Sequence, residues 1–545
     1  TNYGWLHGLS ISSGLQNSLD PYGDIWSKKD GNKRADFYAG INLCNIFIER
    51  IDDVYNMEDG EKREWKAEVK ALKAYMYFEL VRHYGPIMLV PNAVDPNQDI
   101  RDLQIPRSHV DTCFAAIVRL CDEAAKDLRP FNQKESSRRT YFNKEAALAL
   151  KARALLYQAS DLFNGNPDYA NFVNKNGEPL FSIEKDKEKW RRAAEAADSA
   201  IQICLINGKH LVTGQTAATE LQGYMLNIEN STATFNYTND EALLMIKPNP
   251  QNYEAWQFTL PNITTDPNHL LTGTCISPSM KMVEMFYTDN GLPIDQDPTY
   301  SSGNLYSQTE ETDPYYTDVV ALNEPILVLH TKREPRFYAD IAADRCYWRL
   351  GRTVDNLYKV EAYRGETFGL KENRLNSTLP QNLSGYWLKK WTSSNAELYN
   401  YQSSLNALGD KPFPVIRMAE LYLIAAEAWN EYLDAPDERV YDKIDAVRER
   451  AGIPDVRTSW AMARDKGKVS TKSGMRDIIR QEWNIEFAFE GFRYWNVRRW
   501  KTAQVELNEK LFGWNVVGDD FTSFYNNGKG PVIVDSDNRF VAPRD

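Results

Sequence analysis

The sequence is poor in cysteine and histidine and has no long hydrophobic run. Its 545 residues include six cysteines and six histidines. No two cysteines form a Cys-x-x-Cys pair, and no two histidines lie close enough to suggest a pair of metal ligands. No stretch approaches the roughly 18 apolar residues of a membrane-spanning helix. We therefore predict no zinc or redox site, no cofactor and no disulfide framework.

The usual catalytic signatures are also missing. The sequence contains no G-x-G-x-x-G, no G-x-x-x-x-G-K-[ST], no G-x-S-x-G and no H-E-x-x-H motif. We therefore expect a binding protein rather than an enzyme. A catalytic set assembled from residues far apart in the sequence stays open as an alternative.

Positive charge is in short supply. The formal net charge is −12 at pH 7, with a pI near 5.3. Nucleic-acid backbones are held mainly by lysine and arginine. Arg191-Arg192 and Arg498-Arg499 are short pairs rather than basic stripes. We therefore predict no nucleic-acid partner.

Helical periodicity dominates residues 1–210 and returns in residues 411–505. Apolar residues recur there at three- and four-residue spacing, and alanines are frequent along the same stretches. The predicted helices are Tyr38–Ile51, Glu61–Tyr84, Val110–Leu128, Ala146–Ala159 with Asn143 as its cap, Glu188–Ile206, Ile416–Glu431 and Val440–Ala451. The pattern predicts a mainly α fold built on a tetratricopeptide-like scaffold of helical pairs.

The helix Glu61–Tyr84 carries two apolar faces. One is formed by Trp65, Val69, Leu72, Met76 and Leu80, and the other by Ala67, Ala71, Ala74 and Phe78. A helix with two apolar faces packs against neighbours on both sides. We therefore expect it in the interior of the scaffold.

Residues 211–410 differ from the helical segments in composition and in periodicity. Gly, Pro, Asn, Asp and Thr become frequent, and helical periodicity fades. One helix is predicted at Pro278–Tyr287, with strands near Ala242–Lys247 and Gly385–Trp391. We predict an irregular, loop-rich lobe with short strands that carries the ligand, because binding residues usually lie on loops. Residues 506–545 are similar and are predicted to form a tail packed on this lobe.

Three glutamates are the strongest local candidates for chemistry. Glu482, Glu486 and Glu490 are spaced by four, which places them on one stripe of a predicted helix within Ile478–Trp500. One interpretation is an acid/base set. The other is an ionic lock that holds this helix to a neighbour, with Arg480, Arg493, Arg498 and Arg499 as the nearby cations. The apolar face of Ile479, Trp483 and Phe487 beside the stripe favours the lock.

Two further segments carry weaker signals. Asp289-Asn290-Gly291, followed by Asp295 and Asp297, offers oxygen ligands for calcium, but the spacing does not match an EF-hand and favours a turn. Cys275 lies in a Thr-Gly-rich loop without a basic neighbour that would activate its thiol. Neither segment predicts a metal or a nucleophile.

Aromatic side chains are abundant, with 30 Tyr and 14 Trp. A tyrosine or tryptophan presents a flat apolar face with a polar edge, and sugar rings have matching faces with hydroxyls at the rim. Core packing explains most of these rings. Those in polar surroundings, such as Tyr347-Trp348 and Tyr386-Trp387, are candidates for stacking against a sugar.

Several segments, in order along the chain, resemble the SusD/RagB family of surface nutrient-binding lipoproteins. They are Cys44–Ile46, Glu68–Ile87, Met282–Tyr287, Phe413–Leu423, Val447–Pro454 and Ile479–Asn496. The resemblance implies a cell-surface protein on the outer membrane that captures oligosaccharides. It also implies delivery to a SusC-like TonB-dependent transporter, on which the protein acts as a lid. Members begin with a signal peptide and a lipidated cysteine. Residues 1–5 show neither, so we expect a lipid anchor ahead of Thr1.

The same resemblance suggests where a ligand binds. It points to the early loops, which contain Trp5, His7, Asp24 and Trp26, and to the loop 262–277, which contains Cys275. We add Arg345, Tyr347, Trp348 and Tyr386 from their aromatic and arginine content. Trp26 can equally pack against the helix that begins at Tyr38. The rival functions are a peptide-binding member of the family, a glycosidase on a helical scaffold and a pure protein-interaction scaffold.

Overall fold

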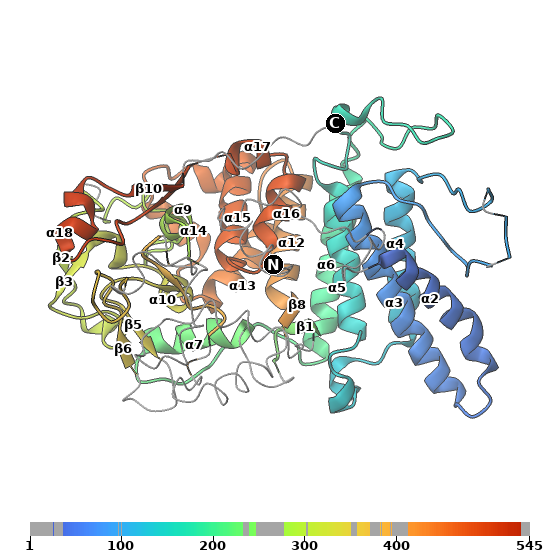
Figure 1. Ribbon diagram of the computed structural model, residues 1–545, viewed down its shortest axis with the longest axis horizontal. Helices are drawn as coiled ribbons and strands as arrows, with labels where there is room; N and C mark the ends of the chain where they lie inside the picture. Colours follow the sequence, from blue (N-terminus) through green and yellow to red (C-terminus); the bar gives the residue numbers. More distant parts are fainter. Residues whose placement is uncertain are drawn as a thin grey trace.

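Helical pairs stand side by side in the computed structural model of the chain (Figure 1). The structure describes residues 26, 36–95, 97–99, 101–232, 239–246, 277–300, 304–349, 357–370, 382, 384–392, 394, 413–508 and 510–535. Within these residues no helix is both long and apolar enough to cross a membrane.

The scaffold is built from two sets of helices. The first comprises α2 (Phe37–Arg50), α3 (Asp59–Tyr84), α4 (Val110–Asp127), α5 (Lys144–Ala159) and α6 (Glu188–Ile206). The second comprises α12 (Met418–Tyr432), α13 (Glu438–Arg450), α14 (Val456–Met462), α15 (Lys472–Glu486), α16 (Phe492–Arg499) and α17 (Ala503–Glu506). Neighbours in each set pack on one another, and α6 packs against α12, which joins the two sets. This arrangement confirms the predicted scaffold of helical pairs.

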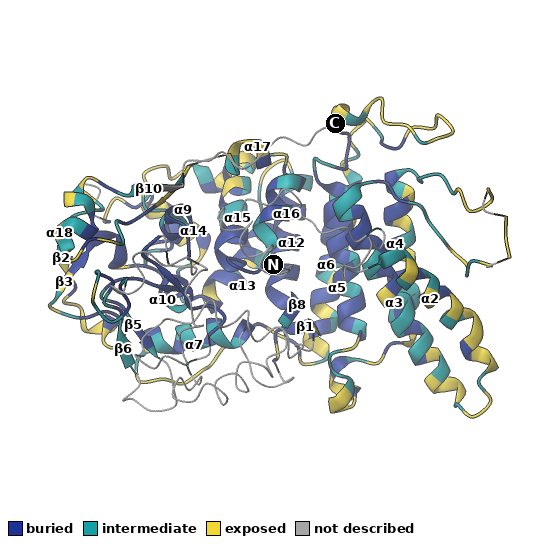
Figure 2. Cartoon of the chain, in the orientation of Figure 1, coloured by how far each residue is buried: buried dark blue, intermediate teal, exposed yellow. Residues whose placement is uncertain are grey.

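Alanine allows the helices of the scaffold to approach closely. Ala146, Ala149 and Ala152 of α5 are fully buried, and α6 turns Ala193 and Ala197 inward. A methyl side chain keeps the two backbones near each other and costs little side-chain entropy. Asn143 caps α5 as predicted, since its Oδ1 accepts a hydrogen bond from Ala146 N–H at 2.8 Å. Buried residues run through α5, α6 and α12, and the far ends of α2 and α3 are exposed (Figure 2).

A second lobe is formed mainly by residues between α6 and α12 and is completed by residues 511–535 of the C-terminal segment. Its helices are α7 (Glu220–Thr232), α9 (Met280–Met285), α10 (Pro335–Asp340) and α18 (Phe521–Phe524). Its strands form antiparallel pairs: β1 (Ala242–Ile246) with β8 (Phe413–Arg417), β2 (Gln308–Glu310) with β3 (Pro325–Leu327), β4 (Ile341–Ala342) with β7 (Trp387–Leu388), β5 (Tyr347–Arg349) with β6 (Leu357–Lys359), and β9 (Leu511–Gly513) with β10 (Val532–Asp535). This lobe matches the predicted irregular part with short strands.

The lobe has an aromatic core of its own. Trp348, Tyr386 and Trp391 are buried there together with Trp514 and Tyr525 from the C-terminal segment. Because α12–α16 lie between this lobe and α2–α6 (Figure 1), the C-terminal helices contact both. At the junction between lobe and scaffold, α13 contacts α7, α15 contacts α9, and α5 contacts β1 and β8.

Three predicted elements need correction. The helix expected at Pro278–Tyr287 is shorter, because the Ser279 hydroxyl caps it and α9 ends at Met285. The helix expected from Ile416 begins at Met418, since the two residues before it complete β8. The segment Ile478–Trp500 is two helices: the chain turns with Phe489 at φ 64° and Gly491 at φ 83°.

Candidate functional site

The three glutamates of the α15 region form a buried ionic cluster. Arg336 of α10 donates to Glu482 at 2.6 Å and to Glu486 at 3.2 Å. Arg417 of β8 donates to Glu486 at 2.6 Å and to Glu490 at 2.8 Å. All five side chains are buried. The cluster therefore joins α15 to the second lobe and to β8, which is the ionic lock expected from the sequence.

The partners of these glutamates differ from the predicted ones. Arg480, Arg493, Arg498 and Arg499 form no ion pair with them in the described part of the chain, where the cations are Arg336, Arg417, Arg448, Arg450 and Lys390. Glu490 also lies beyond the end of α15 rather than on its helical stripe. Arg493, Arg498 and Arg499 follow α15 on the other side of the turn at Phe489, and Arg480 lies on α15 itself, so closeness in sequence did not bring these four arginines to the glutamates.

Glu486 is held in the ionised form. Burial alone raises the pKa of Glu486, but Arg450, Arg417 and Arg336 reverse this effect and hold it well below its ordinary value. A general acid needs a pKa near the working pH and access to substrate. Glu482 and Glu486 are both too buried for such a role. In addition, the pKa of Glu486 is too low for a general acid.

The Asp289 segment is a turn. Asp297 accepts hydrogen bonds from the Thr288 hydroxyl at 2.7 Å and from the Asn290 amide at 3.0 Å, and Gly291 has a φ of 68°. These contacts already use the Asp297 carboxylate. Among the described residues, no group of three or more His, Cys, Asp or Glu side chains is placed to hold a metal.

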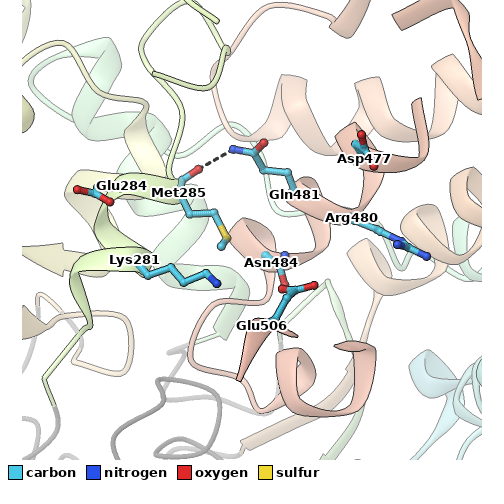
Figure 3. A pocket seen from close by; sticks show the side chains of 8 residues that line it. All are labelled: Lys281, Glu284, Met285, Asp477, Arg480, Gln481, Asn484 and Glu506. Atoms are coloured by element: carbon cyan, nitrogen blue, oxygen red, sulfur yellow. Dashed lines mark hydrogen bonds between the residues drawn. The ribbon is translucent and has the colours of Figure 1, made fainter. Parts of the chain in front are cut away.

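A surface pocket of about 420 Å³ opens where α9 meets α15 and α17 (Figure 3). It is lined by Lys281, Glu284 and Met285 of α9, by Asp477, Arg480, Gln481 and Asn484 of α15, and by Glu506 of α17. The pocket thus lies between a helix of the second lobe and helices of the scaffold. One wall of the pocket, α9, begins a few residues after the predicted ligand loop 262–277.

A side-chain hydrogen bond holds the two walls together. Gln481 Nε2 donates to the carbonyl of Met285 at 2.9 Å, which ties the end of α9 to α15. Glu284, the residue before Met285, accepts from the Tyr306 hydroxyl at 2.9 Å, and burial raises the pKa of its carboxyl. The width of the pocket is therefore set by contacts that lie within its own walls.

Asn484 has unused hydrogen-bonding capacity in the pocket wall. The residue is only 9 % exposed, and its Oδ1 has no hydrogen-bond partner among the residues that the structure describes. Leaving a buried polar atom unpaired costs free energy, commonly about 1–3 kcal/mol. Such an atom in the wall of a cavity marks a place where a ligand hydroxyl restores the missing bond.

None of the predicted ligand residues that the structure describes lines this pocket. Trp5, His7, Asp24 and Cys275 lie outside the described residues. Trp26 is half-buried and makes edge-on ring contacts with Tyr38 at 5.0 Å and Tyr84 at 5.2 Å, with Arg107 over its ring. This is the packing against the Tyr38 helix that the sequence offered as the alternative.

Arg345 and the remaining aromatics lie in the second lobe. Arg345 pairs with Glu366 at 3.2 Å and stacks over the Tyr363 ring, and Tyr347 is half-buried on β5. Trp348 is 1 % exposed and packs on Phe368, so it presents no face to solvent.

Tyr386 is fully buried. Its hydroxyl accepts from Trp514 Nε1 at 2.8 Å and lies 2.9 Å from His330 Nε2. Trp348 and Tyr386 are therefore core residues of the lobe in this structure, and we do not carry them into the proposed site.

The pocket residues were missed because they come from separate segments. Gln481 and Met285 are far apart in the chain and meet only through the packing of the lobe on the scaffold. One local signal existed: Asn484 is an asparagine within a helix, where its propensity is poor, four residues after Arg480 on the same face. That pattern indicates a polar face with a purpose other than packing.

A helical-pair scaffold with an inserted loop-rich lobe and a polar pocket at their junction defines a class of binding protein. Family models match the chain in two places: "SusD family" over residues 231–539 and "Starch-binding associating with outer membrane" over residues 9–156. The chain belongs to the SusD family. No curated protein sequence matches it.

Solved structures agree with this assignment. The protein titled BT4246 is 25% identical, with a TM-score of 0.75, over 92% of this chain and 84% of that chain. A SusD-like protein (BF3747) from Bacteroides fragilis is 22% identical, with a TM-score of 0.63, over 94% and 86%. A SusD-like carbohydrate binding protein (BF0978) from the same organism is 20% identical, with a TM-score of 0.58, over 92% and 78%. The last two matches establish the fold.

Proposed function

We propose that this protein captures oligosaccharides at the outer surface of the cell and delivers them to a SusC-like TonB-dependent transporter, on which it acts as a lid. It is held at the outer membrane by a lipid anchor ahead of Thr1. The proposal includes no catalytic step. Its main support is membership of the SusD family, one of whose models is described as starch-binding and associated with the outer membrane.

The chemistry of the pocket suits a sugar. Asn484 Oδ1 requires a donor, and a sugar hydroxyl both donates and accepts. Met285 adds an apolar surface for the C–H face of a sugar ring. The hydrogen bond from Gln481 to the Met285 carbonyl fixes the position of α9 relative to α15. The pocket is the size of small-molecule sites, which enclose roughly 300–1,000 Å³.

Loop residues extend this site in our proposal. The segment containing Trp5, His7, Asp24 and Trp26, and the segment containing Cys275, stay predicted ligand contacts. Trp26, Arg345 and Tyr347 are the described members of the set with some exposed surface. A long oligosaccharide that fills the pocket with one sugar reaches further contacts with its other rings.

A glycan panel tests the binding function. Calorimetry of the purified chain against neutral and acidic oligosaccharides, with chromatography of the same samples afterwards, is expected to detect binding at micromolar to millimolar Kd without shortened products. Shortened products abolished by Glu486→Gln favour the glycosidase alternative. A parallel panel of peptides covers the peptide-binding alternative.

Asn484→Ala tests the pocket as the place of binding. We expect affinity for the bound oligosaccharide to fall by about tenfold, the effect of losing one well-placed hydrogen bond. Asn430→Ala is the matched control, because Asn430 is also buried with an unpartnered Oδ1 but lies on α12 away from the pocket. Equal losses in both variants overturn the pocket assignment.

Co-purification tests the transporter. The full chain, expressed with its own leader in the source cell, is expected to co-purify from outer-membrane extracts with a TonB-dependent transporter. A variant with the anchoring cysteine removed is expected to leave the membrane fraction. Recovery of the anchored protein without any transporter contradicts the lid role.

A further inference from the structure

Arg480 forms no direct ion pair in the described part of the chain, and the carboxylates that act on its charge, Glu427 and Glu431, are themselves paired with Arg499 and Arg476. Among the described residues, no acidic side chain lies within ion-pair distance of its guanidinium, and its Nε has no hydrogen-bond partner. Arg476, one turn earlier on α15, differs in this respect, because it forms an ion pair with Glu431 at 2.5 Å. Arg480 instead lies over the Trp500 ring, 4.9 Å from its centroid.

The surroundings of Arg480 make this charge costly. Burial lowers the pKa of Arg480, and the nearby Arg499 lowers it further, while Glu427 acts in the opposite direction. Glu427 itself is held by Arg499 at 2.5 Å and by Trp500 Nε1 at 2.9 Å. A guanidinium in such a place is stabilised by any anion that reaches it.

The acidic residues of the pocket are already engaged. Glu506 pairs with Arg493 at 2.8 Å, and Asp477 lies 3.3 Å from Lys468. Glu284 accepts the Tyr306 hydroxyl. Each of these carboxylates has its partner outside the pocket lining, whereas the charge of Arg480 remains to be matched.

We propose that the α9–α15 pocket selects an acidic sugar, with Arg480 binding its carboxylate or sulfate group and Asn484 accepting a hydrogen bond from a neighbouring hydroxyl. This inference rests on the proposed glycan-binding function and names the substrate class of that same site. Arg480 and Asn484 are four residues apart on α15, so they lie on one face of the helix, and both line the pocket.

The two cations of the lining frame the pocket. Lys281 of α9 and Arg480 of α15 stand on opposite sides of it, with Met285, Asn484 and Glu506 between them (Figure 3). An arginine presents a planar fork of donors that matches a carboxylate in two parallel hydrogen bonds. A neutral sugar meets Asn484 but leaves the charge of Arg480 unmatched, so the acidic ligand binds more tightly.

Calorimetry with three matched probes tests the selection. The probes are an oligogalacturonate, a sulfated chondroitin oligosaccharide and a neutral maltooligosaccharide of similar length. We expect at least one acidic probe to bind about tenfold or more tightly than the neutral one, because hydrogen bonds to charged groups are about twice as strong as neutral ones. The affinity of the acidic probe is expected to fall with added NaCl, and that of the neutral probe to stay constant.

Variants locate the effect. Arg480→Gln is expected to weaken the acidic probe about tenfold and to leave the neutral probe within about twofold. Arg480→Lys, which keeps the charge, recovers part of the loss. Arg63→Gln on α3 removes an exposed arginine far from the pocket and is the control for the change in net charge. Asn484→Asp adds a negative charge and provides a second test if Arg480→Gln fails to fold.

These experiments distinguish a failure of the acidic-sugar proposal from a failure of the proposed glycan-binding function. Binding of the neutral probe alone, or acidic binding that Arg480→Gln leaves unchanged, overturns the acidic selection while glycan binding stands. Binding of no probe and no member of the wider glycan panel overturns both. The carboxylated and sulfated arms identify which anionic group the arginine takes.

Discussion

Arg417 of β8 donates from Nη1 to Glu486 Oε1 of α15 at 2.6 Å, and both side chains are buried from solvent. The same Nη1 also donates to Glu241 at 2.7 Å, so one guanidinium joins the residue that precedes β1 to α15. Charges buried in this way are stable only as a complete set.

Glu486→Gln is expected to destabilise the protein by about 3–5 kcal/mol, because it leaves the arginines around it with one anion fewer in a buried place. Urea unfolding followed by circular dichroism measures the change. Glu438→Gln breaks an exposed pair with Arg457 and is expected to cost less than about 1 kcal/mol. Similar costs for the two variants would contradict the role of the cluster as a junction.

Asp344 makes stability depend on pH. Its carboxylate accepts from Ala362 N–H at 3.0 Å and from the Tyr525 hydroxyl at 3.1 Å, and burial raises its pKa from 3.8 to about 6. The folded chain therefore holds a proton that the unfolded chain has released, and this group favours folding less and less as pH rises from about 4 to about 6.

Asp344→Asn removes that titration. We expect the difference between the unfolding free energies at about pH 4 and about pH 7 to change by about 2–3 kcal/mol relative to the wild type, in the direction of better relative stability at pH 7. Urea titrations at several pH values measure it. Asp434→Asn, at a fully exposed side chain, should leave the pH profile unchanged.

Gly452 ends α13 in a conformation that a side chain does not tolerate. Its φ is 75°, and a Cβ there would meet the Tyr224 ring of α7 at 2.5 Å. Gly452→Ala is expected to cost about 2–4 kcal/mol, the sum of the backbone strain and the clash. Gly177→Ala separates the two, since Gly177 has a φ of 81° with nothing within 4 Å, and should cost only about 1 kcal/mol. Equal losses would show that the ring moves aside freely.

Gln481 positions α9 and so acts on the ligand indirectly. Gln481→Ala is expected to weaken oligosaccharide binding several-fold and to change global stability by only about 0.5–1.5 kcal/mol. Hydrogen exchange should report faster exchange at the α9 amides. Gln158→Ala removes a side-chain bond to Asp111 in the scaffold and serves as the control, with affinity unaffected. Unchanged exchange in α9 would argue against this role.

The sequence predicted the scaffold well, because helix formation here follows local patterns. The helix Glu188–Ile206 is found with the predicted bounds, and Asn143 caps α5. The prediction of which face of a helix is buried was less accurate. In α3 the Ala67–Ala71–Ala74 stripe is buried, while Leu72 of the supposed main face is 39% exposed. Small residues mark the crossing of close-packed helices more reliably than large ones do.

The structural features that the sequence did not predict arise from contacts between segments far apart in the chain. The helix ends at Glu486 rather than continuing, because Glu490 is drawn to Arg417 and Lys390 from other elements. The pocket arises in the same way, where α9 of the second lobe meets α15. Periodicity describes one segment at a time and carries no information on which segments meet. The family resemblance supplied the function class, and the structure supplied the pocket.

The buried ionic cluster also determines when the protein can finish folding. Arg450 pairs with Glu241, 209 residues earlier in the chain, and Arg336 pairs with Glu482, 146 residues later. Because α15 is synthesised after all of its partners, Glu241 and Arg336 stay hydrated until the C-terminal helices arrive. Closing contacts of such long range is slow. The lobe and the scaffold therefore acquire their final structure together, late and cooperatively, and a chain truncated before α15 is a substrate for proteolysis rather than a shorter functional protein.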